Sequence, residues 1–142
     1  MPIADSYEIA KNMDRLMRRI DAASHKRASA LDTDKIGQLG GLVLLAIAEL
    51  HPVTMQDLVR HVGRDKSQMT RLVQMMELKG VIARTPSPTD GRVTLLHPTE
   101  KGCAFVATIR ALMSDVMDEV LAPLTAKDRA TFDRILRDIW GS

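Results

Sequence analysis

Aromatic side chains are scarce in this sequence. Phe, Trp and Tyr together make up 3% of its 142 residues, so a buried core has to be assembled from aliphatic side chains and methionine. Aliphatic residues at helical spacing are typical of α-helices that pack against one another. The scarcity therefore favours a mainly α-helical chain, and the length fits a single domain.

Cysteine is nearly absent as well. The one thiol, Cys103, excludes an intrachain disulfide framework and is compatible with a reducing cytoplasm. Two interpretations of Cys103 stay open. Helix N–H groups could lower its pKa and make it reactive, or the residue could serve as a small buried hydrophobe. The second is favoured, so we expect Cys103 to be buried.

Patterns that carry catalysis or hold metals are missing. The four histidines, at positions 25, 51, 61 and 97, have no i, i+4 pairing and no nearby carboxylate at a recurrent metal spacing. The sequence also has no Ser/His/Asp order, no glycine loop that cradles phosphate and no cluster of carboxylates. We therefore expect no metal, no cofactor and no enzymatic activity.

Long apolar runs are missing too. The most apolar stretch, residues 39–50, is too short to span a bilayer and contains Gly40 and Gly41. The first twenty residues mix acids with bases and lack the apolar segment of a signal peptide. These absences predict a soluble cytoplasmic protein without a membrane partner.

The chain is organised around residues 54–82, which contain two helix starts. In each, a side-chain oxygen can accept a hydrogen bond from a backbone N–H three residues later. The two capping pairs are Thr54 with Asp57 and Asp65 with Gln68. Gly63 can adopt the positive φ with which a helix ends. The spacing predicts a helix of about two turns, a tight turn and a helix of about four turns, which Gly80 ends.

The second of these helices has one apolar and one polar face. Its apolar residues recur at i, i+3, i+4 and i+7, and we expect them to be buried: Met69, Leu72, Val73 and Met76. The outward face then carries Ser67, Arg71 and Gln74, flanked by Gln68, Thr70 and Met75. One charge with short amide and hydroxyl groups suits contacts to base edges and phosphates in a DNA major groove. An ordinary solvated face has the same composition, so the helix alone does not decide between them.

Two β-prone runs follow this helix. Residues 81–84 and 92–96 flank a loop rich in Pro, Gly and Asp, which predicts a hairpin. Pro86 and Pro88 cannot donate to a strand ladder and suit an exposed tip. Val53 and Thr54 suffice for one short strand beside the hairpin. A helix pair followed by a hairpin with Arg84 and Arg92 near its ends is the outline of a winged helix.

Positive charge is concentrated in the same region. Residues 60–92 hold seven bases and three acids, a net charge of +4, whereas the whole chain carries +2. The remainder is therefore slightly acidic. A basic segment that coincides with the helix pair and the hairpin is the expected electrostatic signature of a DNA-binding surface.

Apolar stripes at both ends of the chain exceed what one small domain can cover. The first stripe comprises Ile9, Met13, Leu16, Met17 and Ile20. The second lies on a long helix after Thr99 and comprises Phe105, Val106, Ile109, Leu112, Met113, Val116, Met117, Val120 and Leu121. A further helix starts at Thr125, with Asp128 as its capping partner. The helical spacing of apolar residues is lost in residues 25–34, which indicates a loop or frayed end. The simplest partner that would cover both apolar stripes is a second copy of the chain. Val116 and Met117 are then expected in the seam, that is, in the dimer interface.

The motifs of the wing carry a family resemblance. The chain resembles the MarR family of bacterial transcription regulators in residues Ser67, Thr70, Arg71, Leu72, Leu78, Lys79, Gly80, Val81, Arg84, Asp90, Arg92, Thr99, Lys101 and Gly102. It departs from the family at Gly91, where a second Arg is common, and at Pro98, where Leu is usual. We expect Gly91 to weaken DNA contact at the wing tip and Pro98 to perturb the start of the next helix.

The resemblance implies several further properties. Family members dimerise through their first and last helices, and they often release DNA when a small aromatic or phenolic molecule enters the crevice between the dimer helices and the DNA unit. Their peroxide-sensing thiols generally sit in the first helix, where this chain has none. Asp90 is expected to orient the wing backbone or to pair with Arg84 or Arg92.

The prediction is a mainly α chain with a small β-hairpin wing. Residues 1–142 form one MarR-like domain, with a winged helix-turn-helix unit at 36–98 and dimerisation helices at 5–30 and 99–140. The expected function is a homodimeric repressor of transcription that binds a pseudo-palindromic DNA operator. Expected DNA contacts are Lys66, Ser67, Gln68, Thr70, Arg71, Gln74, Arg84, Asp90 and Arg92.

Two rival functions remain. One is a dimeric winged-helix module that binds another protein and no longer binds DNA. The other is a thiol-based or metal-dependent enzyme on a helical bundle, which would need Cys103 and a histidine to converge in a pocket.

Overall fold

A computed structural model describes residues 3–28 and 35–141 of the chain. The chain divides into two compact units, one of Met1–Ser29 with Leu112–Ser142 and the other of Ala30–Ala111. We call these the terminal unit and the central unit. The boundary between them falls inside one helix, α5 (Glu100–Val120). Among the described residues, no helix is long and apolar enough to cross a membrane.

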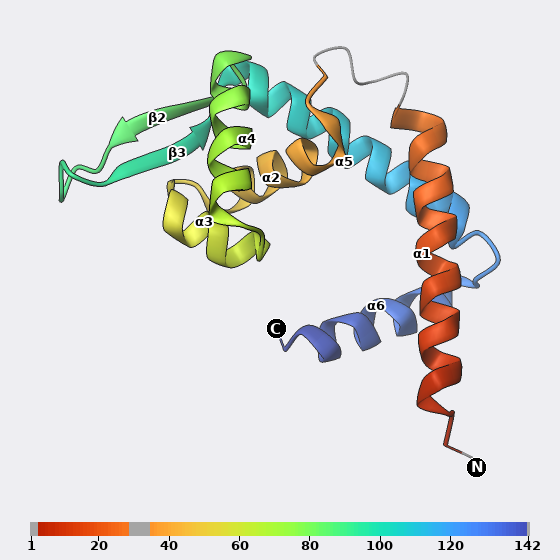
Figure 1. The fold of residues 1–142 in the computed structure, drawn as a ribbon. Coiled ribbons are helices and arrows are strands. Elements are labelled where there is room, and N and C mark those ends of the chain that lie inside the picture. The colour runs from red at the N-terminus through yellow and green to blue at the C-terminus, as the bar shows by residue number, and fades with distance from the viewer. Residues whose placement is uncertain (1–2, 29–34, 142) are drawn as a thin grey trace. The chain divides into compact units, whose positions relative to one another are not determined.

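The central unit is a winged helix-turn-helix (Figure 1). Its elements run in the order α2 (Gly37–Leu50), β1 (Val53–Thr54), α3 (Met55–Val62), α4 (Lys66–Leu78), β2 (Ile82–Pro86), β3 (Thr94–Pro98) and the first half of α5. The three strands form one antiparallel sheet in the order β1-β3-β2. The mainly α fold with a small wing is therefore confirmed.

Aliphatic side chains and methionine fill the core of this unit. The fully buried members include Leu44, Ile47, Leu58, Met69, Val73, Met76, Ile82 and Leu96. They come from α2, α3, α4 and both hairpin strands, so one core holds the helix pair and the wing together. Leu72, which was expected in the buried face of α4, is partly buried at the edge of this core.

Both predicted helix starts in the centre of the chain are confirmed. Thr54 Oγ1 accepts a hydrogen bond from the Asp57 N–H at 3.1 Å. The carboxylate of Asp65 accepts one from the Gln68 N–H at the same distance. Gly63 ends α3 with φ +70°, the left-handed conformation that a glycine adopts without strain.

The hairpin is confirmed, but both strands lie further along the chain than expected. Val81 precedes β2 because its N–H bonds to the Met76 carbonyl in the turn after α4. Arg92 and Val93 precede β3 because their N–H groups bond to Asp90 in the loop. Pro86 lies within β2 and not at the tip. Since β2 is an edge strand, the missing N–H of proline leaves the ladder intact there.

The turn after α4 is locked to the start of α5. Thr99 donates its hydroxyl to the Gly80 carbonyl at 2.5 Å and its N–H to the Val81 carbonyl at 3.1 Å. The same hydroxyl accepts from the Gly102 N–H at 3.0 Å, so Thr99 caps α5 despite the preceding Pro98. The expectation that Pro98 perturbs this helix start was wrong, because Pro98 pairs with Ile82 as the last residue of β3.

The terminal unit contains α1 (Ser6–Ala28), the second half of α5 and α6 (Ala126–Trp140). A small apolar cluster joins α1 to α5. Its buried members are Ala23, Val116 and Val120. Val116 is 2% exposed within this single chain. It therefore belongs to the core of the unit and not to an exposed seam. The predicted start of α6 is confirmed, because Thr125 accepts from the Asp128 N–H at 3.1 Å.

The first helix includes part of the stretch predicted as a loop or frayed end. Residues 25–28 are helical, and the rest of that stretch, residues 29–34, lies outside the described residues. Arg27 stabilises this last turn, since its guanidinium bonds to the Ala23 carbonyl at 3.1 Å and to Glu119 at 2.5 Å. The hydrogen bond and charge of Arg27 hold the pKa of the Glu119 carboxyl below its ordinary value. Basic residues at a helix C-terminus also interact favourably with its dipole.

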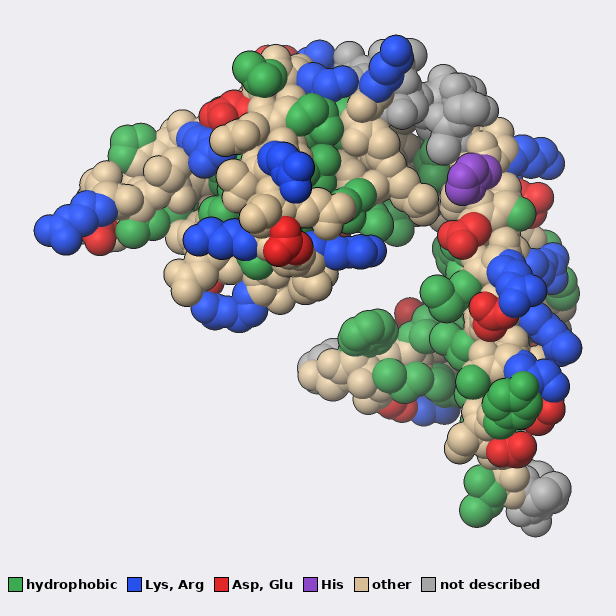
Figure 2. Space-filling view, in the orientation of Figure 1, with side chains coloured by type: hydrophobic (Ala, Val, Ile, Leu, Met, Phe, Trp, Pro, Cys, Tyr) green, Lys and Arg blue, Asp and Glu red, His purple; other side chains and the backbone are tan. Residues whose placement is uncertain are grey.

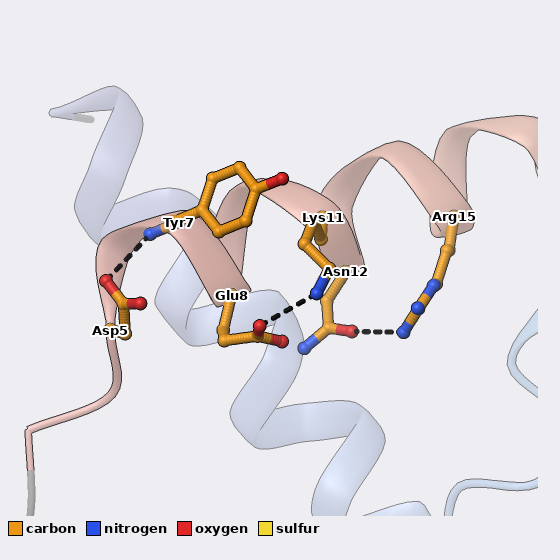
Figure 3. Close-up of polar contacts among 6 residues, drawn as sticks. All are labelled: Asp5, Tyr7, Glu8, Lys11, Asn12 and Arg15. Atoms are coloured by element: carbon orange, nitrogen blue, oxygen red, sulfur yellow. Dashed lines mark hydrogen bonds and ion pairs between the residues drawn. The ribbon is translucent and has the colours of Figure 1, made fainter.

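Local contacts also support the N-terminal part of α1 (Figure 3). Asp5 accepts a hydrogen bond from the Tyr7 N–H at 3.2 Å, as a capping residue does. The Lys11 ammonium bonds to Glu8 at 2.8 Å and lies 5.3 Å from the centre of the Tyr7 ring. These contacts lie on the polar side of the helix and leave its apolar stripe unchanged.

Gly102 tests the lock between α4 and α5. A Cβ at this position would lie 1.9 Å from the Val81 carbonyl oxygen. In a helix without such a clash, alanine is more stable than glycine by up to about 1 kcal/mol. We therefore expect Gly102→Ala to lower the free energy of unfolding by about 1–3 kcal/mol, the usual cost of overpacking.

The measurement is urea denaturation at fixed protein concentration. The matched control is Gly91→Ala, because no atom lies within 4 Å of a Cβ there, and its stability should stay within about 0.5 kcal/mol of wild type. Equal stability of Gly102→Ala and wild type would show that the backbone contact is not tight.

Candidate nucleic-acid interface

The polar face of α4 points outward, as predicted. Ser67, Arg71 and Gln74 are exposed, while Met69 and Val73 on the opposite face are buried. Lys66 and Gln68 in the first turn are exposed as well. The buried residues therefore anchor the helix and present its polar side chains to solvent.

Two of these side chains are partly engaged by the helix itself. The Thr70 hydroxyl donates to the Lys66 carbonyl at 2.8 Å, and Thr70 is half-buried. Its hydroxyl proton is thus already used, which leaves the oxygen as an acceptor. Arg71 bonds through Nε to the Ser67 carbonyl at 3.5 Å, a long and weak contact. The terminal nitrogens of Arg71 make no hydrogen bond or ion pair to the described residues, so they can bind an external group.

The tip of the wing is an ordered loop. Asp90 accepts a hydrogen bond from the Arg92 N–H at 3.1 Å, and its carbonyl accepts one from the Val93 N–H at 3.0 Å. Ser87 Oγ accepts from the Thr89 and Asp90 N–H groups, and the Ser87 N–H bonds to the Val93 carbonyl. Of the roles expected for Asp90, orienting the backbone is the one the structure shows. The exposed Arg92 side chain makes no ion pair within the described part of the chain.

Arg84 lies at the base of the wing and is already paired. Its Nε donates to Glu77 on α4 at 3.1 Å. The expected alternative, a pair between Arg84 and Asp90, is not formed. Arg84 therefore differs from Arg71 and Arg92, whose charges face solvent.

Exposed bases lie on the surface of the central unit drawn in Figure 2, with acidic side chains among them. Figure 2 shows Lys and Arg side chains over the region of α3 and α4 and another at the hairpin tip. Arg60 in this surface pairs with Asp57 at 3.6 Å. Arg64, in the turn before α4, is exposed and makes no ion pair to the described residues. The sequence-based set of contacts omitted Arg64, although its position directly before the capping residue Asp65 was a usable signal.

The structure overturns the expected burial of Cys103. The thiol is exposed in the single chain. The preceding residue on α5, Gly102, is buried against Val81. Val106, one helical turn after Gly102, is buried on the same face of α5. This orientation places Cys103 off the buried side. Within the described residues, no three His, Cys, Asp or Glu side chains gather as they would around a metal ion.

The terminal unit contains an open pocket of about 240 Å³. Ala22, Ala23 and Val120 line its apolar part, and Arg19, Lys26 and Glu119 line its polar part. Glu119 is also the ion-pair partner of Arg27, so the carboxylate is already neutralised.

Comparison with known proteins shows which family the chain resembles. A sequence profile of the MarR family matches residues 41–93. The HTH-type transcriptional regulator YdgJ of Bacillus subtilis is 30% identical over 87 residues, which are 61% of this chain and 51% of YdgJ. This chain therefore spans about half the length of YdgJ. The HTH-type transcriptional repressor IacR of Pseudomonas putida is 25% identical over 130 residues, 92% of this chain and 70% of IacR.

A solved structure shows the same fold. The crystal structure of a mutant MarR from Escherichia coli, complexed with operator DNA, matches with a TM-score of 0.73 at 23% identity. The match covers 96% of this chain and 99% of that chain. In sequence profile, relatives and fold, the chain is thus similar to the MarR family of winged-helix transcription regulators.

The wing loop makes a testable prediction. Asp90→Ala removes the acceptor of the Arg92 N–H, whereas Asp90→Asn keeps the Oδ1 acceptor. A net hydrogen bond of about 1 kcal/mol corresponds to roughly fivefold faster exchange of that amide hydrogen. Hydrogen exchange should therefore speed up at Arg92 in the Ala variant only. The Asp57 amide, bonded to Thr54, is the internal reference. Equal exchange at Arg92 in all three proteins would contradict this role for Asp90.

Proposed function

We propose that the protein is a sequence-specific DNA-binding regulator of transcription without enzymatic activity, acting in the cytoplasm. The observation that carries the proposal is the exposed face of α4, whose polar and cationic side chains lie on the same unit as the wing tip with its exposed Arg92. A helix of this kind fits the major groove, and its polar side chains suit base edges. A loop that presents an exposed arginine, as the wing presents Arg92, suits the minor groove and its phosphates.

The proposed contacts have different roles. Lys66 lies in the first turn of α4, where a base and free N–H groups favour phosphate. Base reading falls to the outward face, namely Ser67, Gln68, Thr70, Arg71 and Gln74. Arg92 approaches the minor groove, with Asp90 shaping the loop that presents it. Arg84 was expected as a further contact, but its pairing with Glu77 at the base of the wing favours a supporting role.

We also propose that a second copy of the chain covers the terminal unit. Apolar side chains remain exposed on α1 and α6: Ile9, Met13, Met17, Ile135, Ile139 and Trp140. Figure 2 shows apolar side chains along both helices. Obligate dimers bury about 2,000 Å² or more of such surface. A C2 dimer would present two copies of α4 to successive major grooves, so the operator should be an imperfect palindrome with half-sites about 10 base pairs apart.

The regulatory output proposed is repression, because a dimer bound across an operator obstructs that DNA. The MarR resemblance further implies relief by a small aromatic or phenolic ligand, which a panel of phenolic acids added to the protein–operator complex would test. A protein-binding module is the second candidate function. Gly91 favours it, because the wing tip lacks a side chain where the family often has a second Arg.

The dimer can be tested at an exposed apolar residue. Ile139 is 71% exposed in the single chain, and an aspartate there would place a charge in the proposed interface. We expect Ile139→Asp to sediment as a folded monomer at micromolar concentration and to lose operator binding. Ala130→Asp is the matched control, since residue 130 lies on the opposite side of α6 and is exposed. A dimeric Ile139→Asp would contradict the interface.

The DNA contacts can be tested by comparing two arginines. An Arg that reads a guanine edge contributes about 1–3 kcal/mol of discrimination. Arg71→Ala should therefore weaken binding to a selected operator far more than binding to random DNA. Arg92→Ala should weaken both and reduce the salt slope by about one unit. Both variants should keep the wild-type melting temperature, because both side chains are exposed.

The operator for these measurements comes from DNA selected out of random oligonucleotides by the purified protein. Lys127→Ala on α6 removes one exposed charge from the other unit and controls for net charge. Equal, sequence-independent losses for Arg71→Ala and Arg92→Ala would refute base reading by Arg71. Unchanged binding in both variants would favour the protein-binding module.

A further inference from the structure

One ion pair joins the proposed recognition helix to the wing. The Nε of Arg84 on β2 lies 3.1 Å from Oε1 of Glu77 on α4. The two side chains are 32% and 39% exposed, so the pair lies at the rim of the core and is neither buried nor fully solvated. Both residues belong to the central unit.

The register of the sheet explains why Arg84 faces α4. Arg84 pairs with Leu96 on β3, and cross-strand partners present their side chains on the same face of a sheet. Leu96 is buried in the core, as is Ile82 two residues before Arg84 on β2. Arg84 therefore follows Ile82 on the core-facing side, at the point where the hairpin leaves the core. Its aliphatic stem continues the apolar surface while its guanidinium reaches Glu77.

Beyond this point the wing has less support. Thr85 and Pro86 are exposed, and the loop that follows is held by hydrogen bonds within itself. On its outer side β2 has no neighbouring strand among those described, because it is an edge strand. The ion pair between Arg84 and Glu77 is thus a side-chain tether between the wing and α4. It is attached to β2, the edge strand of the sheet.

We propose that Glu77 and Arg84 are positioning residues that set the wing relative to α4, so that Arg92 and Arg71 can contact one DNA duplex together. Arg84 acts through Glu77 and does not serve as a phosphate ligand. The pairing also neutralises the Glu77 carboxylate, which would otherwise repel phosphate from the recognition helix. The proposal rests on the DNA-binding function proposed above.

The test measures how much Arg92 contributes to operator affinity when the tether is intact and when it is broken. Arg92→Ala is introduced into wild type, Glu77→Ala, Arg84→Gln and the charge-exchanged double variant Glu77→Arg/Arg84→Glu. One phosphate contact is worth about tenfold in affinity near 0.1 M salt. We expect that loss in wild type, less than about threefold in the two single variants, and recovery toward about tenfold in the exchanged variant.

The rival is direct contact between Arg84 and phosphate. In that case Arg84→Gln alone would reduce the salt slope by about one unit, as loss of one phosphate contact does. The effect of Arg92→Ala would then be the same in all four backgrounds, and this outcome would overturn the proposal. Asp138→Asn, which breaks an ion pair of 2.8 Å with Arg134 on α6, is the control and should leave the Arg92 effect at its wild-type size.

Two readouts separate this proposal from the proposed function. Melting temperatures of the two single variants should stay near wild type, because half-exposed ion pairs add little stability. Without DNA, the Arg84 Nε–H resonance in nuclear magnetic resonance should exchange slowly in wild type and faster in Glu77→Ala, which removes the Oε1 acceptor. An unchanged resonance would show that the tether is absent and would overturn the proposal. Failure of wild type to bind any duplex while this resonance responds would refute the DNA-binding function and leave the tether in place.

Discussion

The central unit depends on one close backbone contact, between Gly102 in the first turns of α5 and the Val81 carbonyl after α4. No side chain fits between them. Thr99 adds two hydrogen bonds to the same turn, and Lys101 bonds to the Lys79 carbonyl at 3.0 Å. The carbonyls at the end of a helix need such partners because no intrahelical donor reaches them. These contacts give hydrogen-bond partners to the carbonyls at the end of α4. They also set the rotation of α5 about its axis.

The proposed DNA surface follows from how the core is shared. Met69 and Val73 bury one side of α4, and Ile82 and Leu96 bury one face of the hairpin in the same core. The shared core therefore holds α4 and the base of the hairpin in fixed positions relative to each other without a ligand. Charges that face solvent cost little to keep unpaired, whereas Arg84, at the rim of the core, has a carboxylate partner. Such preorganisation lowers the entropy lost when a protein binds.

The terminal unit presents the opposite balance of buried and exposed apolar surface. Ala23, Val116 and Val120 are its buried hydrophobic residues, whereas Met17 and Trp140 stay exposed on its helices. Large exposed apolar surfaces on helices are typical of interfaces between protein chains. The ion pair of Arg27 with Glu119 joins α1 to α5 within the unit, so the unit has internal polar contacts as well as its apolar cluster. Its exposed stripe is the physical basis for proposing a second copy as its partner.

Capping and helical periodicity act over a few residues, so the sequence by itself determined the helix-turn-helix, the hairpin and the outward face with Arg71. It also determined the caps at Thr54 and Asp65. Tertiary structure alone decided which distant residues meet. The contact at Gly102 turned Cys103 to the surface, and the sheet register gave Arg84 its partner on α4. No local pattern carries this information, because it depends on how one element rotates and packs against another that is remote in the chain.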